Sequence, residues 1–307
     1  MAYATRHFGS VIKGLLNIMM NNKRAPLSVT KTVREVLFDG YDDGLLTIVR
    51  AYNNSDIPKP PFEKFGWFVD RNESEIYDGE FTMFTGVDDI KKLGVLQLWN
   101  GEAKSPNFRG KCSEVRGTTG ELWPPIPEGT KPDISVFATD VCRTVTLKYH
   151  EEYEKFGIKG YKWIGDESVL DNGVKHPEMA CYCSADLSEC PDLLPGVFNA
   201  SSCKFGAPAM VSFPHFYLAD PSYRDKISGM NPDRNKHEFS IAMEPRTGIP
   251  LKINAQLQIN LLMEQIEGYN VVKGVPRTIM PMFWFRQTAE LTEELAGQAK
   301  VSLIQRF

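Results

Sequence analysis

The sequence predicts a mainly β, antiparallel fold with helices near both ends of the chain. Apolar residues follow a helical spacing only in the first 52 residues and in the tail from Thr288. Between these regions, short apolar segments of strand type are separated by turns rich in Gly, Pro and Asn. Strands and helices do not alternate along the chain, so the pattern argues against a parallel sheet.

Residues 8–52 predict three helices. In the first helix, apolar side chains recur every four residues and form two adjacent stripes, Val11, Leu15 and Met19 beside Ile12, Leu16 and Met20. Thr32–Glu35 has the form of a capping box, which starts a short helix that Gly40 ends. Asp42 is expected to cap the third helix, and the segment Pro58–Pro61 then stops helical structure.

Strands are expected throughout the region 62–287. The predicted strands cover Glu80–Thr85, Val95–Trp99, Ile134–Phe137, Val141–Tyr149, Tyr161–Ile164, Ala209–Phe216, Glu238–Met243, Pro250–Met263 and Thr278–Phe285. Asn100–Gly101 is a hairpin-type turn signal after the second of them. Residues 251–261 alternate between apolar and other side chains, which predicts one apolar face. The tail then forms a helix with three apolar residues in line, Leu291, Leu295 and Ala299.

The six cysteines all lie between positions 112 and 203. The segment Asp171–Phe205, which holds four of them, is poor in long apolar runs, so covalent cross-links would stabilise it. Disulfides are therefore the favoured interpretation, and they imply an oxidising compartment. The spacing of Cys181–Cys183 and its neighbours does not match a usual structural zinc site. A zinc site that includes His176, or a set of free thiols, is the alternative.

The composition is that of an ordinary globular protein, with 42% hydrophobic and 24% charged residues and a net charge of −4. No basic tract is long enough to follow a nucleic-acid backbone. No apolar run reaches the roughly 18–20 residues that span a bilayer, and the N-terminus lacks the form of a signal peptide. Because disulfides indicate the outside of the cell, we expect the chain to be incomplete. Three sequons, at Asn53, Asn72 and Asn199, fit a glycoprotein.

The sequence predicts no enzyme. Motifs of nucleophilic, zinc-dependent and nucleotide-dependent catalysis are absent, so a hydrolase is the least favoured class. His215 is the one histidine in an apolar setting. A core histidine with a backbone hydrogen bond is favoured there over a catalytic base, because no nucleophile motif lies beside it. His237–Glu238 and His150–Glu152, the latter at the end of a predicted strand, are expected at the surface.

A series of motifs resembles the ectodomain of the class B scavenger receptors. The motifs are Phe65–Phe68, Asp78–Glu80, Thr85–Gly86, Trp99–Gly101, Val115–Gly120, Asp140–Arg143, Gly206–Pro208, Ser212–Phe216, Gly229–Pro232, Pro245–Gly248 and Gln256–Asn260. They keep the order that they have in the family, and the resemblance extends from about Ser28 to the C-terminus.

The resemblance implies one ectodomain over residues 1–307. Its parts would be an apical helical bundle over 8–56, an antiparallel β-barrel over 62–287 and a juxtamembrane helix over 288–307. An internal lipid tunnel would run through the barrel, and 112–203 would be its disulfide-rich segment. Family members carry a transmembrane helix at each end. We therefore expect the N-terminal part to be missing, as in a fragment, a truncated isoform or an incomplete gene model.

The resemblance also implies specific residues. The expected disulfides are Cys112–Cys181, Cys142–Cys203 and Cys183–Cys190, of which the spacing by itself supports only the last. Basic residues near the proposed apex would bind anionic ligands, namely Lys23, Arg24, Lys31 and Arg34. No catalytic residue, metal ligand or cofactor is expected.

The function that the resemblance implies is the binding and transfer of lipids at a membrane surface. Expected partners are fatty acids, sterols, phospholipids or lipoprotein particles. The alternative is a lysosomal sorting receptor that binds a hydrolase through its apical helices, with Val33, Val36 and Leu37 in the contact. This region would be extracellular or luminal, in a membrane protein of the plasma membrane or the lysosome.

Overall fold

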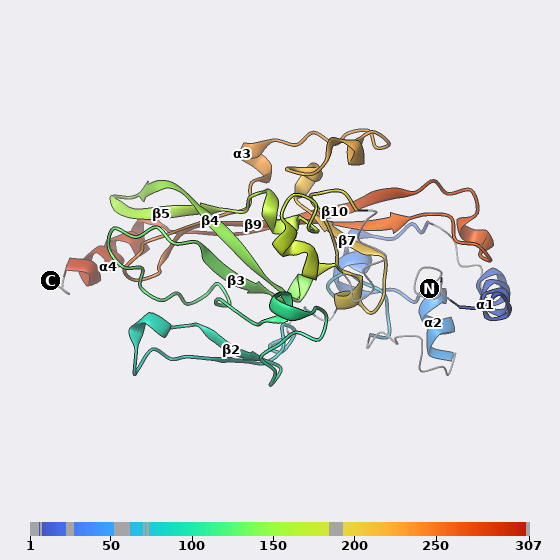
Figure 1. The fold of residues 1–307 in the computed structure, drawn as a ribbon, viewed down its shortest axis with the longest axis horizontal. Coiled ribbons are helices and arrows are strands. Elements are labelled where there is room, and N and C mark those ends of the chain that lie inside the picture. Colours follow the sequence, from blue (N-terminus) through green and yellow to red (C-terminus); the bar gives the residue numbers. More distant parts are fainter. Residues whose placement is uncertain are drawn as a thin grey trace. The chain divides into compact units, whose positions relative to one another are not determined.

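Figure 1 shows the fold as a computed structural model, which describes residues 6, 8–22, 28–51, 62–69, 71, 74–183 and 193–304. These residues form two compact units. The first unit comprises Met1–Gly79, Asn199–Met210 and Leu261–Met280, and the second comprises Glu80–Phe198, Val211–Asn260 and Pro281–Phe307. Each unit is described by itself.

The main sheet has eight strands in the order β3-β4-β5-β8-β9-β7-β6, with β10 paired to β9. The strands are β3 (Ile134–Ala138), β4 (Arg143–Lys155), β5 (Ile158–Ile164), β6 (Val197–Asn199), β7 (Ala209–Ser212), β8 (Ser240–Met243), β9 (Pro250–Met263) and β10 (Thr278–Glu290). The pairs from β3 to β9 through β4, β5 and β8 are antiparallel, as is the separate pair β1 (Phe81–Met83) and β2 (Leu96–Trp99). The predicted mainly β, antiparallel fold is thus confirmed.

The β4–β5 hairpin is longer than the sequence predicts. Phe156 and Gly157 both have positive φ values, 49° and 74°, as a two-residue type I′ turn requires. The strands pair up to Lys155 and Ile158 on either side of this turn. The expected end of the strand at Tyr149 is therefore wrong. Charged residues fill most of the added part of β4 and conceal its two-residue period. Tyr153 is its one apolar side chain, and it packs with buried Ile158 against the cluster that contains Leu251 and Leu291.

The core of the second unit lies under this hairpin. A cluster of buried apolar side chains joins β3, β4, β5 and β8, namely Trp123, Ile134, Leu147, Trp163, Ile241 and Met243. The Trp163 indole also donates a 2.8 Å hydrogen bond to the Pro132 carbonyl, so its polar atom is satisfied inside the core. Gly160 leaves room for the next strand, because a Cβ there would lie 2.4 Å from the Met243 carbonyl oxygen.

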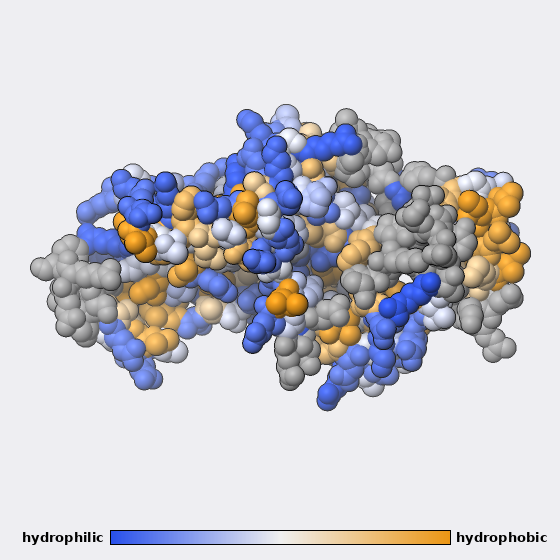
Figure 2. Space-filling view, turned by 90° about the horizontal axis from the view of Figure 1, so that it is seen from below, coloured by the Kyte–Doolittle hydropathy of each residue, from blue (hydrophilic) through white to orange (hydrophobic). Residues whose placement is uncertain are grey.

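In the first unit, the helix α1 (Ser10–Asn22) buries one of its two predicted stripes. Leu16 and Met20 pack with Tyr269 in a small core. In the other predicted stripe, Val11 and Leu15 face solvent and are 77% and 55% exposed, whereas Met19 packs against this core. Ile18, which belongs to neither predicted stripe, is also exposed, at 56%. Figure 2 shows apolar surface at the end of the view where Figure 1 places α1. The helix is therefore apolar on two sides but packed on only one.

The predicted capping box is confirmed. Thr32 and Glu35 exchange hydrogen bonds: the Thr32 N–H donates to Glu35 Oε2 at 2.9 Å, and the Glu35 N–H donates to Thr32 Oγ1 at 3.2 Å. A π-helical segment, Glu35–Asp39, follows and ends at Gly40, whose φ is 70°. The next helix, α2 (Gly44–Ala51), is capped by Asp43, which accepts from the Leu46 N–H at 3.2 Å. The expected cap at Asp42 is wrong by one residue, and Pro58–Pro61 lies outside the described residues.

The last helix, α4 (Glu293–Ile304), begins after Thr292, whose hydroxyl accepts from the Leu295 N–H. Leu291 and Ala296 are buried, whereas Leu295 is exposed. The expected line of Leu291, Leu295 and Ala299 is thus wrong at its middle member, because Leu291 precedes the helix and does not share its spacing. In the part of the chain that the structure describes, no helix combines the length and apolar character needed to cross a membrane.

Candidate functional site

The second unit contains an apolar cavity of about 50 Å³. Its walls are almost entirely carbon and come from β3, β4, β9 and the segments beside them. The lining residues are Val136, Ala138, Val141, Arg143, Val145, Val169, Leu170, Phe213, Phe239 and Leu257. A cavity with so little polar surface offers nothing that would hold water in place, so it suits an apolar guest.

Leu257 lies on β9, whose two faces differ in burial. The most deeply buried residues of its C-terminal half are polar: Gln256, Gln258 and Asn260. The apolar residues at the alternate positions, Leu257, Ile259 and Leu261, are only half-buried. On this half of the strand the polar face is therefore more deeply buried than the apolar face.

The buried amides of β9 are stabilised by hydrogen bonds. The Gln258 and Asn260 side-chain amides both donate to the Ser212 hydroxyl, at 3.3 and 3.1 Å. Gln258 Oε1 accepts from the His215 N–H at 2.9 Å, and the Gln256 amide donates to the Glu238 carbonyl at 2.7 Å. Burial of these groups is possible because they find such partners. Periodicity cannot reveal these partners, since they come from distant segments.

Arg143 contributes the stem of its side chain to the cavity and turns its guanidinium onto aromatic rings. The guanidinium carbon lies 3.4 Å from the centre of the Tyr182 ring and 4.8 Å from that of Phe198. Its Nε and Nη1 atoms are buried and have no hydrogen-bond partner among the described residues. Burial lowers the pKa of Arg143 to about 10, and Tyr182 partly offsets this effect, so the side chain keeps its charge at neutral pH.

The disulfide-rich segment holds Tyr182 in this position. A disulfide joins Cys112 to Cys181, the pair that the resemblance implies. Cys142, Cys183 and Cys203 are also disulfide-bonded. Their pairing, and the part of Cys190, which lies outside the described residues, stays a prediction. The alternatives of free thiols and a metal site find no support here, since the described cysteines are all oxidised.

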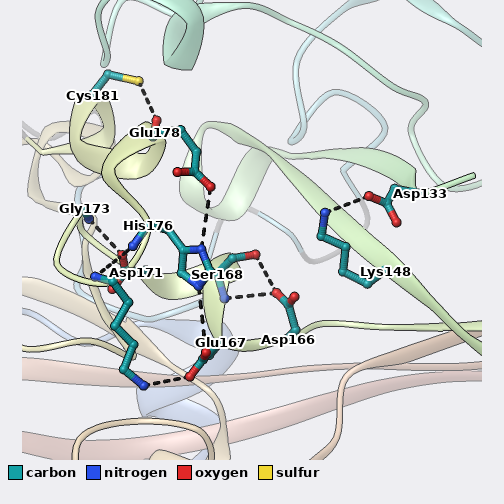
Figure 3. A network of polar contacts seen from close by, with 11 residues as sticks. Asp133, Lys148, Asp166, Glu167, Ser168, Asp171, Gly173, His176, Glu178 and Cys181 are labelled. Atoms are coloured by element: carbon teal, nitrogen blue, oxygen red, sulfur yellow. Dashed lines mark hydrogen bonds and ion pairs between the residues drawn. The ribbon is translucent and has the colours of Figure 1, made fainter.

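Figure 3 shows how a buried carboxylate shapes the loop before Cys181. Asp171 is fully buried, and its Oδ2 accepts three backbone N–H bonds, from Gly173 at 3.1 Å, Lys175 at 3.1 Å and His176 at 2.8 Å. Glu167 binds the Lys175 ammonium at 2.7 Å, and this hydrogen bond lowers the pKa of Glu167. The loop leads directly into the short helix η6 (Pro177–Tyr182), which carries both Cys181 and Tyr182.

The predicted basic residues do not form a free cluster in the described part of the chain. Arg34 is exposed and binds Asp39, with Nε 2.9 Å from Oδ2. The Lys31 ammonium lies 5.0 Å from the centre of the Tyr41 ring. Lys23 and Arg24 lie outside the described residues, so their part in ligand binding stays a proposal.

Of the three predicted glycosylation sites, the structure describes only Asn199. Asn53 and Asn72 lie outside the described residues. Asn199 ends β6 and is only 8% exposed, and its side-chain oxygen accepts from the Ser201 N–H at 2.9 Å. Asn199 therefore does not lie in an exposed loop, because the strand buries it. Glycosylation at the three sites stays a prediction.

Of the two histidines expected at the surface, His150 is exposed and His237 is buried. His237, at the end of the short helix α3 (Arg234–His237), is buried against the rings of His215 and Trp284, and Glu238 is buried in ion pairs with Lys162 and Arg234. His150 is exposed as expected, but it lies inside β4 and not at its end. His215 has the predicted backbone bond, since its Nδ1 accepts from the Asn231 N–H at 3.2 Å. In the described residues, no group of three or more His, Cys, Asp and Glu side chains could hold a metal ion.

Comparison with known proteins gives the class to which this fold and its motifs belong. The model of the CD36 family matches residues 1–306, so the chain belongs to the CD36 family. The resemblance to the class B scavenger receptors is thereby confirmed.

Three relatives illustrate the match. The chain is 37% identical over 290 residues to the protein peste of Drosophila melanogaster, covering 94% of this chain and 51% of peste. It is 32% identical over 284 residues to scavenger receptor class B member 1 of Cricetulus griseus, covering 91% and 53%. It is 31% identical over 289 residues to sensory neuron membrane protein 2 of Heliothis virescens, covering 88% and 55%. The chain spans about half the length of these relatives.

Proposed function

We propose that the chain is part of a scavenger receptor that binds lipids or lipid-bearing particles and passes their acyl chains into its interior without chemistry. Membership of the CD36 family supports a receptor of this kind. The observation that carries the proposal is the apolar cavity of the second unit, whose walls suit hydrocarbon. At about 50 Å³ it takes the end of an acyl chain and not a whole lipid.

The energetics of such binding come from burial. Each methylene that leaves water contributes about 0.8 kcal/mol. Two half-buried apolar residues of β9 in the second unit, Leu257 and Ile259, would add to the apolar surface that an acyl chain meets. The Arg143 charge does not face the cavity, because its guanidinium stacks on the Tyr182 and Phe198 rings.

The wider architecture belongs to the same proposal. We infer an ectodomain in which this cavity is one part of a lipid tunnel, with an apical helical bundle and membrane anchors. The expected location is the plasma membrane, with this region outside the cell, and the lysosome is the alternative. Antibody staining of unpermeabilised cells that express the gene would separate the two, because only a surface receptor would be labelled.

The cavity is tested with a variant that fills it. Ala138 lines the cavity on β3, and replacing it with Leu would occupy the space. Displacing two methylenes would cost about 1.6 kcal/mol. We therefore expect Ala138→Leu to weaken binding of a fluorescent long-chain fatty acid by about tenfold or more, measured by fluorescence titration.

The matched control is Ala289→Leu, which makes the same change at an exposed position of β10. It should bind as the unmodified protein does. Equal affinity of Ala138→Leu and the unmodified protein, with both folded by circular dichroism, would refute the cavity as the site. Recovery of the bound ligand as a free acid from an ester probe would refute the absence of chemistry.

A specific observation favours a second function, the sorting receptor that binds a protein through its helices. Helix α1 presents the exposed apolar stripe of Val11, Leu15 and Ile18, and Val33 is 73% exposed nearby in the sequence. Such a stripe has the spacing of a helix that docks in a groove. Replacing Leu15 with Glu should abolish hydrolase capture and leave fatty-acid binding intact. Capture by the Leu15→Glu protein at the original affinity would exclude this use of α1.

A further inference from the structure

Two histidines of the second unit form a stacked pair. The His215 and His237 rings lie 4.5 Å apart between centroids at an interplanar angle of 9°. Trp284 of β10 meets both rings at a steep angle, with centroid distances of 6.3 and 5.8 Å. His237 is only 3% exposed. The pair has no part in the proposed lipid-binding cavity, so its arrangement calls for a separate explanation.

Each ring accepts a hydrogen bond from the same stretch of backbone. His215 Nδ1 accepts from the Asn231 N–H at 3.2 Å, and His237 Nδ1 accepts from the Asp233 N–H at 2.9 Å. A backbone N–H can only donate, so both Nδ1 atoms must be unprotonated and both rings neutral. A histidinium ion has a proton on each nitrogen. Protonation of either ring therefore breaks its bond to this segment.

The pair ties the segment to the sheet. His215 is itself anchored to β9, because its N–H donates to Gln258 Oε1 at 2.9 Å. The bond from Asn231 to His215 spans 16 positions in sequence and thus joins the loop to the strand layer. The bond within Asp233–His237 closes the turn that starts α3. Loss of both bonds would remove these two attachments of residues 226–233, while the Asp233 carbonyl would still accept from the Lys236 and His237 N–H groups of α3.

The charges around the pair favour the neutral rings. Burial lowers the pKa of His237 most, and His215, Lys236 and Arg286 lower it further. Asp233 opposes them. The next residue, Glu238, accepts from Lys162 and Arg234, at 2.7 and 2.8 Å, and is already neutralised by these two cations. A second proton on the stack would place two positive rings in direct contact.

We propose that the His215–His237 stack is a pH-sensitive clasp, which holds residues 226–233 closed at neutral pH and releases them in an acidic compartment. The direction of this pH dependence follows from the number of protons that each form binds. The closed form requires neutral rings, whereas the open form takes up protons below the ordinary histidine pKa of about 6.5. The free-energy advantage of the closed form over the open form is thus fully present above that pH, and it decreases as the pH falls below it.

The size of the effect is set by the number of protons taken up. Each histidine that must be neutral in the closed form makes opening about tenfold more frequent per pH unit below about 6.5. For the pair, a plot of the logarithm of the opening equilibrium constant against falling pH should therefore have a slope between one and two. Hydrogen–deuterium exchange with mass spectrometry on the 307-residue chain measures this opening for residues 226–233. Exchange rates are compared from pH 7.4 to 5.0 after correction for the intrinsic pH dependence.

The deciding variant is His215→Asn with His237→Asn, since an asparagine oxygen can replace Nδ1 as the acceptor but does not titrate. We expect the segment to stay protected at both ends of the pH range in this variant. His176→Asn is the matched control, because His176 is another half-buried histidine of the second unit and lies outside the clasp. It should retain the full slope of the unmodified protein.

A flat pH response in the unmodified protein would overturn the proposal, as would an unchanged slope in the double variant. If the double variant does not fold, His215→Asn alone, at the less buried of the two positions, should reduce the slope by one. The slope of the unmodified protein then still decides the question, because a value below one rejects the clasp.

Discussion

Arg143 is a full positive charge held by aromatic rings in the interior of the second unit. Burial lowers its pKa to about 10, which records the cost of desolvating the guanidinium. The Tyr182 ring, at 3.4 Å, and the Phe198 ring, at 4.8 Å, offset this cost by cation–π attraction. A planar guanidinium can stack on such faces, whereas the compact ammonium of lysine cannot. The sequence shows an ordinary arginine here, since nothing in its neighbours reveals the rings.

This account predicts an unusual order of stability for two replacements. Arg143→Met should lie within about 1 kcal/mol of the original protein, because an apolar side chain of similar length removes a buried charge. Arg143→Lys should be less stable than Arg143→Met by about 2 kcal/mol, because the charge stays and the stacking is lost. Urea unfolding followed by circular dichroism gives both values. If the lysine variant proved as stable as the methionine variant, stacking would not be what holds Arg143.

At the scale of the element, the segment from Asp171 to Cys183 is fixed from both ends. The Asp171 carboxylate orders the loop at one end, and the Cys112–Cys181 bond fixes the other. Local hydrogen bonds and a long-range cross-link thus replace the apolar core that this segment lacks. Tyr182 is thereby placed over Arg143, and the segment becomes part of the wall behind the cavity.

The cross-link carries a prediction about this element. Its two cysteines are 69 positions apart, and closing a loop of that size should contribute about 4 kcal/mol in the chain-entropy model. Replacing both Cys112 and Cys181 with Ser should lower the free energy of unfolding by about that amount. Non-reducing peptide mapping of the same samples tests the expected Cys142–Cys203 and Cys183–Cys190 pairs. A Cys181–Cys183 link in the unmodified protein would contradict the whole connectivity.

Sequence patterns located most elements of this chain but misjudged their faces. The strand 250–263 was bounded correctly by its alternation. Its buried side is nevertheless the polar one at Gln258 and Asn260, because Ser212 and the His215 backbone supply partners there. Alternation shows that a strand has two faces. Only the tertiary structure shows which face meets hydrogen-bonding partners.

At the scale of the whole molecule, the proposed receptor needs a surface that attracts its ligands. The residues proposed for this role are Lys23, Arg24, Lys31 and Arg34. Replacing all four with Glu should reduce capture of vesicles of anionic phospholipid, and the difference should shrink at high salt, because exposed charges are screened over about 10 Å at 0.1 M. Co-sedimentation with the vesicles measures this. Because Arg34 forms an ion pair with Asp39, we expect Arg34 to contribute less to vesicle capture than the three lysine and arginine residues Lys23, Arg24 and Lys31.

A control variant separates position from charge. Replacing four exposed lysines of the second unit with Glu, at Lys91, Lys92, Lys104 and Lys111, changes the net charge by the same amount. This protein should bind the vesicles more strongly than the first variant. Equal loss in both variants would mean that overall charge, and not a basic apex, governs capture.

The sequence by itself determined the class of this protein: its antiparallel β fold, the crowding of its cysteines and the ordered motifs of the CD36 family all follow from local residue patterns. Local patterns suffice for these features because strand periodicity, turns and caps depend on neighbours in the chain. The tertiary structure alone decided the rest: the apolar cavity, the stacking of Arg143 and the pairing of His215 with His237. Each of these joins side chains that are distant in sequence, and the burial that gives them their properties exists only once the strands have come together.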